Sequence, residues 1–185
     1  MKNKALDALS YSYSASDRVL FDANILVSLF SGLEPPGSVP VRKYSQVFKR
    51  IQQGGSAILL DVLVLSEFVN VCAQKYYRLA IAQGGVWTSP KDFRQSPAFK
   101  VLAPTIAGAA KQIEKLARRL DHPFSAWPVP EILDDYATGE HDVNDQFIVE
   151  LCRHEGALLL TNDTEFTSGG ITVLTTHPKL LAACP

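Results

Sequence analysis

The feature that most constrains the fold is a short apolar run that ends in an acid and leads directly into a helical pattern. Residues 19–21 (Val-Leu-Phe) are uninterrupted apolar residues, typical of a strand buried on both faces in a parallel sheet. Asp22 follows them, and apolar residues between 25 and 30 then recur at the spacing of one helix face. Residues 18–30 therefore predict a strand, an acid and a helix, in that order.

Asp22 has two interpretations. Aspartate is a favoured N-cap residue, because its carboxylate accepts hydrogen bonds from the first amides of a helix. The carboxyl end of a strand is also where ligands bind in an open parallel sheet, especially where the strand order reverses. The pattern recurs, since Asp61 follows the apolar run 57–60 and Asp163 follows the run 157–161. This repetition favours a functional role for Asp22, whereas an N-cap is the preferred interpretation of Asp61.

Helices are expected between these strands. Apolar residues recur at helical spacing over 41–54, 62–83 and 142–156, and another short apolar run, 171–174, predicts a final strand. The repeated order of strand, acid and helix indicates parallel strands joined by helices. The chain is therefore expected to have an α/β fold around a central parallel sheet.

The length and composition favour one domain. A chain of 185 residues with 46% hydrophobic residues can bury one good core. Residues 1–17 are rich in Ser and Tyr without a clear period and are expected to form a flexible N-terminal tail. The domain is expected to span 18–176, with an insertion and helical part at 86–136, and residues 177–185 are expected to be a C-terminal tail.

The middle of the chain combines an expected loop with a basic helix. Residues 84–104 contain Gly and Pro and are expected to form a long surface loop, after which Thr105 can cap a helix. One edge of that helix is basic. Its cationic residues are Lys111, Lys115, Arg118 and Arg119. This edge is either an ordinary solvated face or a surface that contacts RNA phosphates, which requires cations but no particular bases.

The overall charge and the cysteines exclude several classes of protein. Lys and Arg number 18 and Asp and Glu 19, so the global field gives no general attraction for nucleic acid or an anionic membrane. The three cysteines form no CxxC pair, which favours a reducing, cytoplasmic setting. The sequence contains no apolar stretch long enough for a membrane span and no signal-peptide core at its start.

Two further acids lie near the starts of predicted helices. Glu67 sits among apolar neighbours, where an unpaired buried carboxylate is costly, so it should reach water, pair with a base or hold a cation. Asp145 lies one turn after Asp142, the expected N-cap, on the side of the helix shared by apolar residues. Asp145 is therefore expected to face the sheet.

These acids can converge if the strands are parallel. Asp22 and Asp163 would then lie at the carboxyl ends of strands, while Glu67 and Asp145 would lie on helices that return over the same edge. Two carboxylates about 5 Å apart repel by roughly 3 kcal/mol at an effective dielectric of about 20, so such a cluster needs protons or cations. Mg²⁺ or Mn²⁺ fits oxygen ligands better than zinc does. The histidines are scattered and are treated as ordinary residues, although His141 is close to the acids in the sequence.

The sequence resembles the PIN-domain family of nucleases over about residues 18–174. Four ordered motifs carry the resemblance: Asp22 and Asn24 in FDAN, the pair Ser66-Glu67, Asp145 opening the helix NDQFIVELC, and Thr161-Asn162-Asp163. The resemblance implies a three-layer α/β/α fold with a central parallel sheet and metal-dependent hydrolysis of RNA phosphodiester bonds. Such enzymes are often the toxin of a VapC-type toxin and antitoxin pair.

The resemblance also implies roles for individual residues. The metal ligands would be Asp22, Glu67, Asp145 and Asp163. Asn24 and Thr161 would support them through hydrogen bonds, and Asp142 would be an additional ligand, a cap or both. The ions implied are Mg²⁺ or Mn²⁺, and the partners implied are an RNA substrate, an antitoxin protein and a second copy of the chain.

Two alternatives stay open at this point. The chain could be a PIN-like RNA-binding or scaffold module that lacks catalysis. It could also be an aspartate-based phosphohydrolase like the haloacid dehalogenases, but those enzymes need a second Asp where this sequence has Asn24.

Overall fold

The computed structural model describes residues 1–139 and 142–185 and contains a parallel β-sheet. The order of the strands is β1-β6-β5-β2-β3-β4, and every neighbouring pair runs parallel. The strands are β1 Lys4–Asp7, β2 Arg18–Phe21, β3 Ala57–Leu60, β4 Arg118–Arg119, β5 Leu158–Leu160 and β6 Thr172–Thr175. With helices packed against this sheet, the expected α/β/α fold is confirmed.

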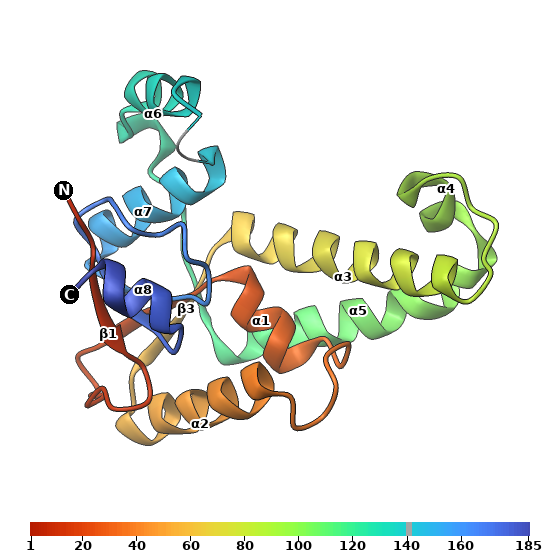
Figure 1. The fold of residues 1–185 in the computed structure, drawn as a ribbon, viewed down its shortest axis with the longest axis horizontal. Helices are drawn as coiled ribbons and strands as arrows, with labels where there is room; N and C mark the ends of the chain where they lie inside the picture. Colours follow the sequence, from red (N-terminus) through yellow and green to blue (C-terminus); the bar gives the residue numbers. More distant parts are fainter. Residues whose placement is uncertain (140–141) are drawn as a thin grey trace.

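Two long helices, α3 and α5, lie side by side and reach away from the sheet, with α4 at their far end (Figure 1). The helices are α1 Ala23–Phe30, α2 Val39–Gly54, α3 Val62–Ala82, α4 Pro90–Gln95, α5 Pro97–Leu116, α6 Val129–Ala137, α7 Val143–Glu155 and α8 Pro178–Ala183, with a 3₁₀ turn η1 at Phe124–Ala126. In the part of the chain that the structure describes, none of them combines the length and the apolar character needed to cross a membrane.

The central strand β2 positions the site. Its residues Val19, Leu20 and Phe21 are buried, as expected for a strand covered on both faces. From β2 the chain proceeds to β3 and β4 on one side, whereas β5 and β6 lie on the other side. The strand order therefore reverses between β2 and β5. At this switch point the backbone N–H of Asp22 donates to the carbonyl of Leu160 at 3.0 Å, which places Asp22 beside the end of β5.

The expectation of a flexible tail at 1–17 and of a C-terminal tail at 177–185 is wrong for the segments nearest the ends. Strand β1 pairs in parallel with β6, and the buried side chain of Asn3 donates to the carbonyl of Phe166 at 3.1 Å. Helix α8 buries Leu180 against the core, and the Ala5 N–H donates to the carbonyl of Cys184 at 2.7 Å. Both segments are held by partners far away in the sequence, which local patterns do not reveal.

The expectation that residues 84–104 form a surface loop is also wrong. It contains α4 and the first turns of α5, and the N-cap of α5 is Ser96, whose hydroxyl accepts from the Phe99 N–H at 3.3 Å. Thr105 lies within α5 rather than at its start. The segment folds because Phe93 is buried and packs edge-on against the rings of Trp87 and Phe99.

Candidate active site

Asp22 is the centre of the candidate site. It occupies the N-cap position of α1, but within the described part of the chain its side chain makes no capping hydrogen bond. Its Oδ2 instead accepts from the Thr161 hydroxyl and from the Asn24 side-chain amide, each at 2.5 Å. The residue is 5% exposed, and burial raises the pKa of Asp22 to about 6, although the Thr161 hydrogen bond opposes this rise.

A hydrogen-bond network ties the start of α1 to the segment after β5. The Asn24 Oδ1 accepts from the backbone N–H of Asn162 at 3.1 Å, and the Thr161 hydroxyl oxygen accepts from the N–H of Asp163 at 2.9 Å. The hydroxyl of the buried Tyr44 donates to the same segment, at 3.2 Å from the Thr161 carbonyl and 2.9 Å from the Asn162 Oδ1. The supporting positions expected for Asn24 and Thr161 therefore exist, and Tyr44 and Asn162 add to them.

The other predicted acids share the electrostatic environment of Asp22. Burial, followed by the charges of Asp22, Asp163 and Asp142, raises the pKa of the half-buried Asp145 to about 7. Partial burial of the Glu67 carboxyl group raises its pKa, and the charges of Asp22, Asp142 and Asp163 raise it further. The carboxylates thus face one edge of the sheet, which is called the acidic edge below.

Glu165 is an acid of this edge that the sequence analysis missed. Its charge also raises the pKa of Asp145, and it lines a small cavity together with Asp142 and Asp145. Its backbone N–H donates to the Asp163 Oδ1 at 2.9 Å. The available signal was its position two residues after Asp163, in a turn that holds that acid.

The donor set fits a hard divalent cation, because it consists of carboxylate oxygens whose mutual repulsion a cation would relieve. Burial is the main cause of the raised pKa values of Asp22, Glu67 and Asp145, and the charges of neighbouring carboxylates add to it. Among residues 1–139 and 142–185, however, no three His, Cys, Asp or Glu side chains lie close enough together to hold one ion. The acids are therefore gathered at one edge but are not closed into a coordination sphere.

Asp142 and Asp61 are helix caps, as expected. The Asp142 Oδ1 accepts from the N–H of Asn144 at 2.7 Å at the start of α7. The Asp61 Oδ1 accepts from the N–H of Leu63 at 2.8 Å at the start of α3, and its Oδ2 contacts the His122 Nε2. A further role for Asp142 as a ligand stays a prediction, and His141 lies outside the described residues.

The predicted basic edge is solvent-exposed. Its cationic residues Lys111, Lys115, Arg118 and Arg119 are all exposed, and Arg119 lies 3.8 Å from Glu114. The last two lie in β4 rather than on the helix. A contact with RNA at this surface stays a prediction.

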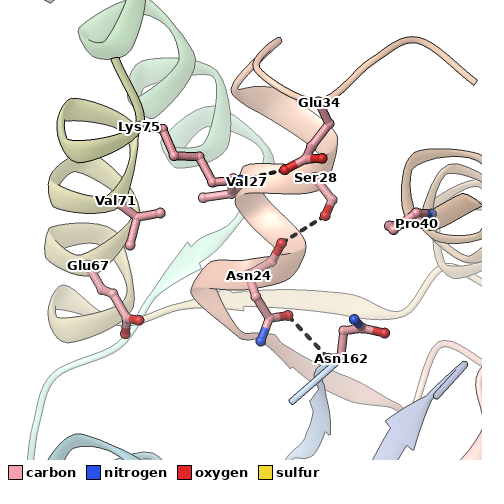
Figure 2. A pocket seen from close by; sticks show the side chains of 9 residues that line it. All are labelled: Asn24, Val27, Ser28, Glu34, Pro40, Glu67, Val71, Lys75 and Asn162. Atoms are coloured by element: carbon pink, nitrogen blue, oxygen red, sulfur yellow. Dashed lines mark hydrogen bonds and ion pairs between the residues drawn. The ribbon is translucent and has the colours of Figure 1, made fainter. Parts of the chain in front are cut away.

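A pocket of about 250 Å³ opens beside the acidic edge (Figure 2). It lies between α1, α3 and the segment after β5. Its lining residues are Asn24, Val27, Ser28, Glu34, Pro40, Glu67, Val71, Lys75 and Asn162. The pocket adjoins the acidic edge, because Glu67 belongs to both and Asn24 of the lining donates to Asp22.

Comparison with a protein-family model agrees with this architecture. The family model of the PIN domain matches residues 19–170. The crystal structure of PAE2754 from Pyrobaculum aerophilum is 21% identical, with 84% of this chain and 90% of that chain covered and a TM-score of 0.47. The comparison with curated proteins gives no match. Because the family model covers most of its length, the chain belongs to the PIN domain family, whose members generally are nucleases.

Proposed function

We propose that this chain is a metal-dependent ribonuclease that hydrolyses RNA phosphodiester bonds. In this proposal Asp22, Glu67, Asp145 and Asp163 hold Mg²⁺ or Mn²⁺. The observation that carries the proposal is the placement of buried Asp22 at the switch point, within the field of the other acids. A bound divalent cation supplies Lewis acidity and neutralises charge that develops on the phosphate and the leaving oxygen.

The remaining residues position the acids. Thr161 and Asn24 donate to the same oxygen of Asp22, which fixes the orientation of its carboxylate. The Glu165 N–H holds Asp163 in the same way. With its pKa at about 7, Asp145 can carry a proton in the cation-free protein and release it near neutral pH.

A direct test is cleavage of a labelled single-stranded RNA by the purified chain in Mg²⁺, in Mn²⁺ and in EDTA. The proposal predicts cleavage with either ion, none in EDTA, and recovery when the ion is restored. Single-stranded DNA of the same sequence tests the choice of RNA. Cleavage that persists at the same rate in EDTA would reject the role of the metal.

A catalytically inactive RNA-binding module is the second candidate. It is supported by the finding that, in the described ranges, no three acids lie within reach of one ion. It predicts binding of RNA without cleavage in either ion, which the same assay detects when binding is measured beside it.

The toxin role and its partners are extensions of the proposal. The resemblance to VapC-type proteins supports an antitoxin protein as inhibitor and a second copy of the chain as partner. Arrest of cell growth on expression of the chain, relieved by co-expression of a neighbouring small protein, would support the toxin role.

A further inference from the structure

The lining of the pocket beside the acidic edge is mostly apolar surface, although six of its nine residues carry polar side chains. Val27 on α1 lies toward Val71 and Lys75 on α3, whereas Ser28 lies on the side of α1 toward Pro40 (Figure 2). Pro40 closes the side toward α2. A concave, mostly apolar site with few placed polar groups is typical of pockets that bind small organic groups.

The polar groups lie at opposite ends of this pocket. At one end Glu67 and Asn24 connect it to the acidic edge, and the Asn24 amide is bonded to Asp22 at 2.5 Å. At the other end Lys75 forms an ion pair with Glu34, whose side chains are 35% and 29% exposed, respectively. A bound molecule can therefore contact both the ammonium group of Lys75, a donor, and the carboxylate of Glu34, an acceptor, which lie next to each other.

This charge pattern disfavours a phosphate as the occupant. Lys75 is already paired with Glu34, and the nearby carboxylate of Glu67 repels anions. Two further donors of the lining are already engaged, because the Asn24 amide donates to Asp22 and the Ser28 hydroxyl donates to the Asn24 carbonyl, whereas a buried anion requires donors. A neutral, flat group with donors and acceptors along one edge matches the pocket better.

We propose that this pocket, the Lys75 pocket, binds one unpaired nucleobase of the RNA strand, with the adjacent phosphodiester at the acidic edge. The inference rests on the proposed ribonuclease function. Each base carries a donor and an acceptor next to each other on its Watson–Crick edge, which Glu34 and Lys75 can engage. A base in a duplex has that edge occupied, so the substrate must be single-stranded where it enters. The volume of about 250 Å³ suits one ring system rather than a larger ligand.

Binding of single-stranded RNA pentamers tests the pocket without catalysis. Four homopolymeric pentamers and one duplex are titrated in EDTA, where phosphate repulsion by the acids is the same for all sequences. The wild type should distinguish the pentamers by their base, because adenine and cytosine present the donor and the acceptor in the opposite order to guanine and uracil, and it should bind the duplex more weakly. Lys75→Met keeps the apolar stem of the side chain. It should weaken binding of the preferred pentamer about 5- to 10-fold, so that the pentamers then bind with similar affinities.

Glu34→Gln separates base recognition from simple attraction of phosphate. If the pair reads the base, this variant also reduces the preference. If Lys75 only attracts phosphate, Lys75→Met weakens all pentamers equally and Glu34→Gln strengthens all of them, which overturns the proposal. Lys179→Met, on the exposed surface of α8, is the matched control and should change nothing. Equal melting temperatures show that the variants are folded.

Mapping of cleavage sites in Mg²⁺ distinguishes the pocket from the ribonuclease activity. The preferred base should recur at a fixed offset from the cut, and Lys75→Met should lose this bias. Cleavage at unchanged sites would reject the pocket and leave the ribonuclease standing. Absence of cleavage together with base-selective pentamer binding would reject the ribonuclease and leave the pocket standing. A wild type that binds no pentamer, or binds all four equally, would reject the pocket.

Discussion

Asp22 and Asp61 occupy equivalent positions in neighbouring strand and helix units, yet they have different surroundings. Each follows a buried apolar strand and precedes a helix, and each is almost fully buried. Asp61 accepts from two amides of α3 and contacts His122. Asp22 accepts from side chains and faces other acids. The local pattern is therefore the same, and the residues that approach from other elements decide what each acid does.

The strand order explains the difference. Strand β2 lies beside β5, so the segment after β5 brings Thr161 and Asp163 to Asp22. Strand β3 lies beside β4, and the chain after β4 brings His122 to Asp61. The ring of Trp127 packs edge-on against His122 at 4.8 Å and covers this second site. Other acids surround the end of β2, whereas an aromatic ring covers the partner of the acid at the end of β3.

The largest expected difference between the two acids is in RNA cleavage. Asp22→Asn should lower the initial rate by about 10³-fold or more, because it removes a proposed ligand of the cation. Asp61→Asn should stay within about 10-fold of the wild type, since it keeps an oxygen for capping α3. Rates are measured in excess Mg²⁺ on the same RNA. If both variants are folded and lose the same cleavage rate, the proposed difference in role between Asp22 and Asp61 is wrong.

Stability should change in the opposite order. Asp61→Ala removes the cap of α3 and the acid partner of His122, and should lower the free energy of unfolding by about 4 kcal/mol. Asp22→Asn should leave it unchanged or raise it at pH 8, because folding disfavours the ionised form of Asp22. Urea denaturation in EDTA measures both. Strong destabilisation by Asp22→Asn would show that Asp22 is also structural.

The stability of the cation-free protein should fall with rising pH. The pKa of Asp22 rises from 3.8 to about 6 on folding, so the folded state binds the proton more tightly between these values. The contribution of Asp22 to stability is therefore complete below about pH 4 and is lost as the pH rises through about 6, by on the order of 3 kcal/mol in all. Asp145, with a pKa of about 7, extends the decline toward neutrality. The midpoint of urea unfolding should depend less on pH in Asp22→Asn than in the wild type, whereas Asp61→Asn should keep the dependence of the wild type.

A divalent cation should restore part of this stability. At about 100 times its dissociation constant, Mg²⁺ stabilises the folded state by about 2.7 kcal/mol, which corresponds to roughly 5 to 10 °C in melting temperature. Asp163→Asn should reduce that rise, whereas Asp61→Asn should keep it. Mn²⁺ is expected to behave alike. Equal shifts in all three proteins would mean that the ion binds elsewhere.

The sequence was sufficient for the elements whose signal is local. Strand β2, strand β3 and the helix after each were expected within a few residues, because continuous apolar runs and helical spacing are properties of short windows. Strand β1 was missed because its four residues, Lys4–Asp7, mix polar and apolar side chains at the sheet edge. Helix α4 was missed because Gly84, Gly85 and Pro90 resemble loop signals, while its stability comes from the ring contacts of Phe93.

The site was predictable as a set of residue types but not as an arrangement. That Asp22, Glu67, Asp145 and Asp163 share one edge depends on strand order, which no single motif encodes. Metal ligation by these acids stays a prediction. Lys75 could not be found from the sequence, because its relevance arises only when α3 packs beside α1.

The pairing of β1 with β6 has a consequence for how the protein matures. Lys4 aligns with Thr172, so the sheet can be finished only after β6 has been synthesised, more than 160 residues after β1. Such distant pairing pays its loop-closure entropy late and belongs to the slow steps of folding. The same late step secures the turn after β5, where Asn3 bonds to Phe166. The segment after β5 therefore gains this contact with Asn3 only after both parts of the chain have been made.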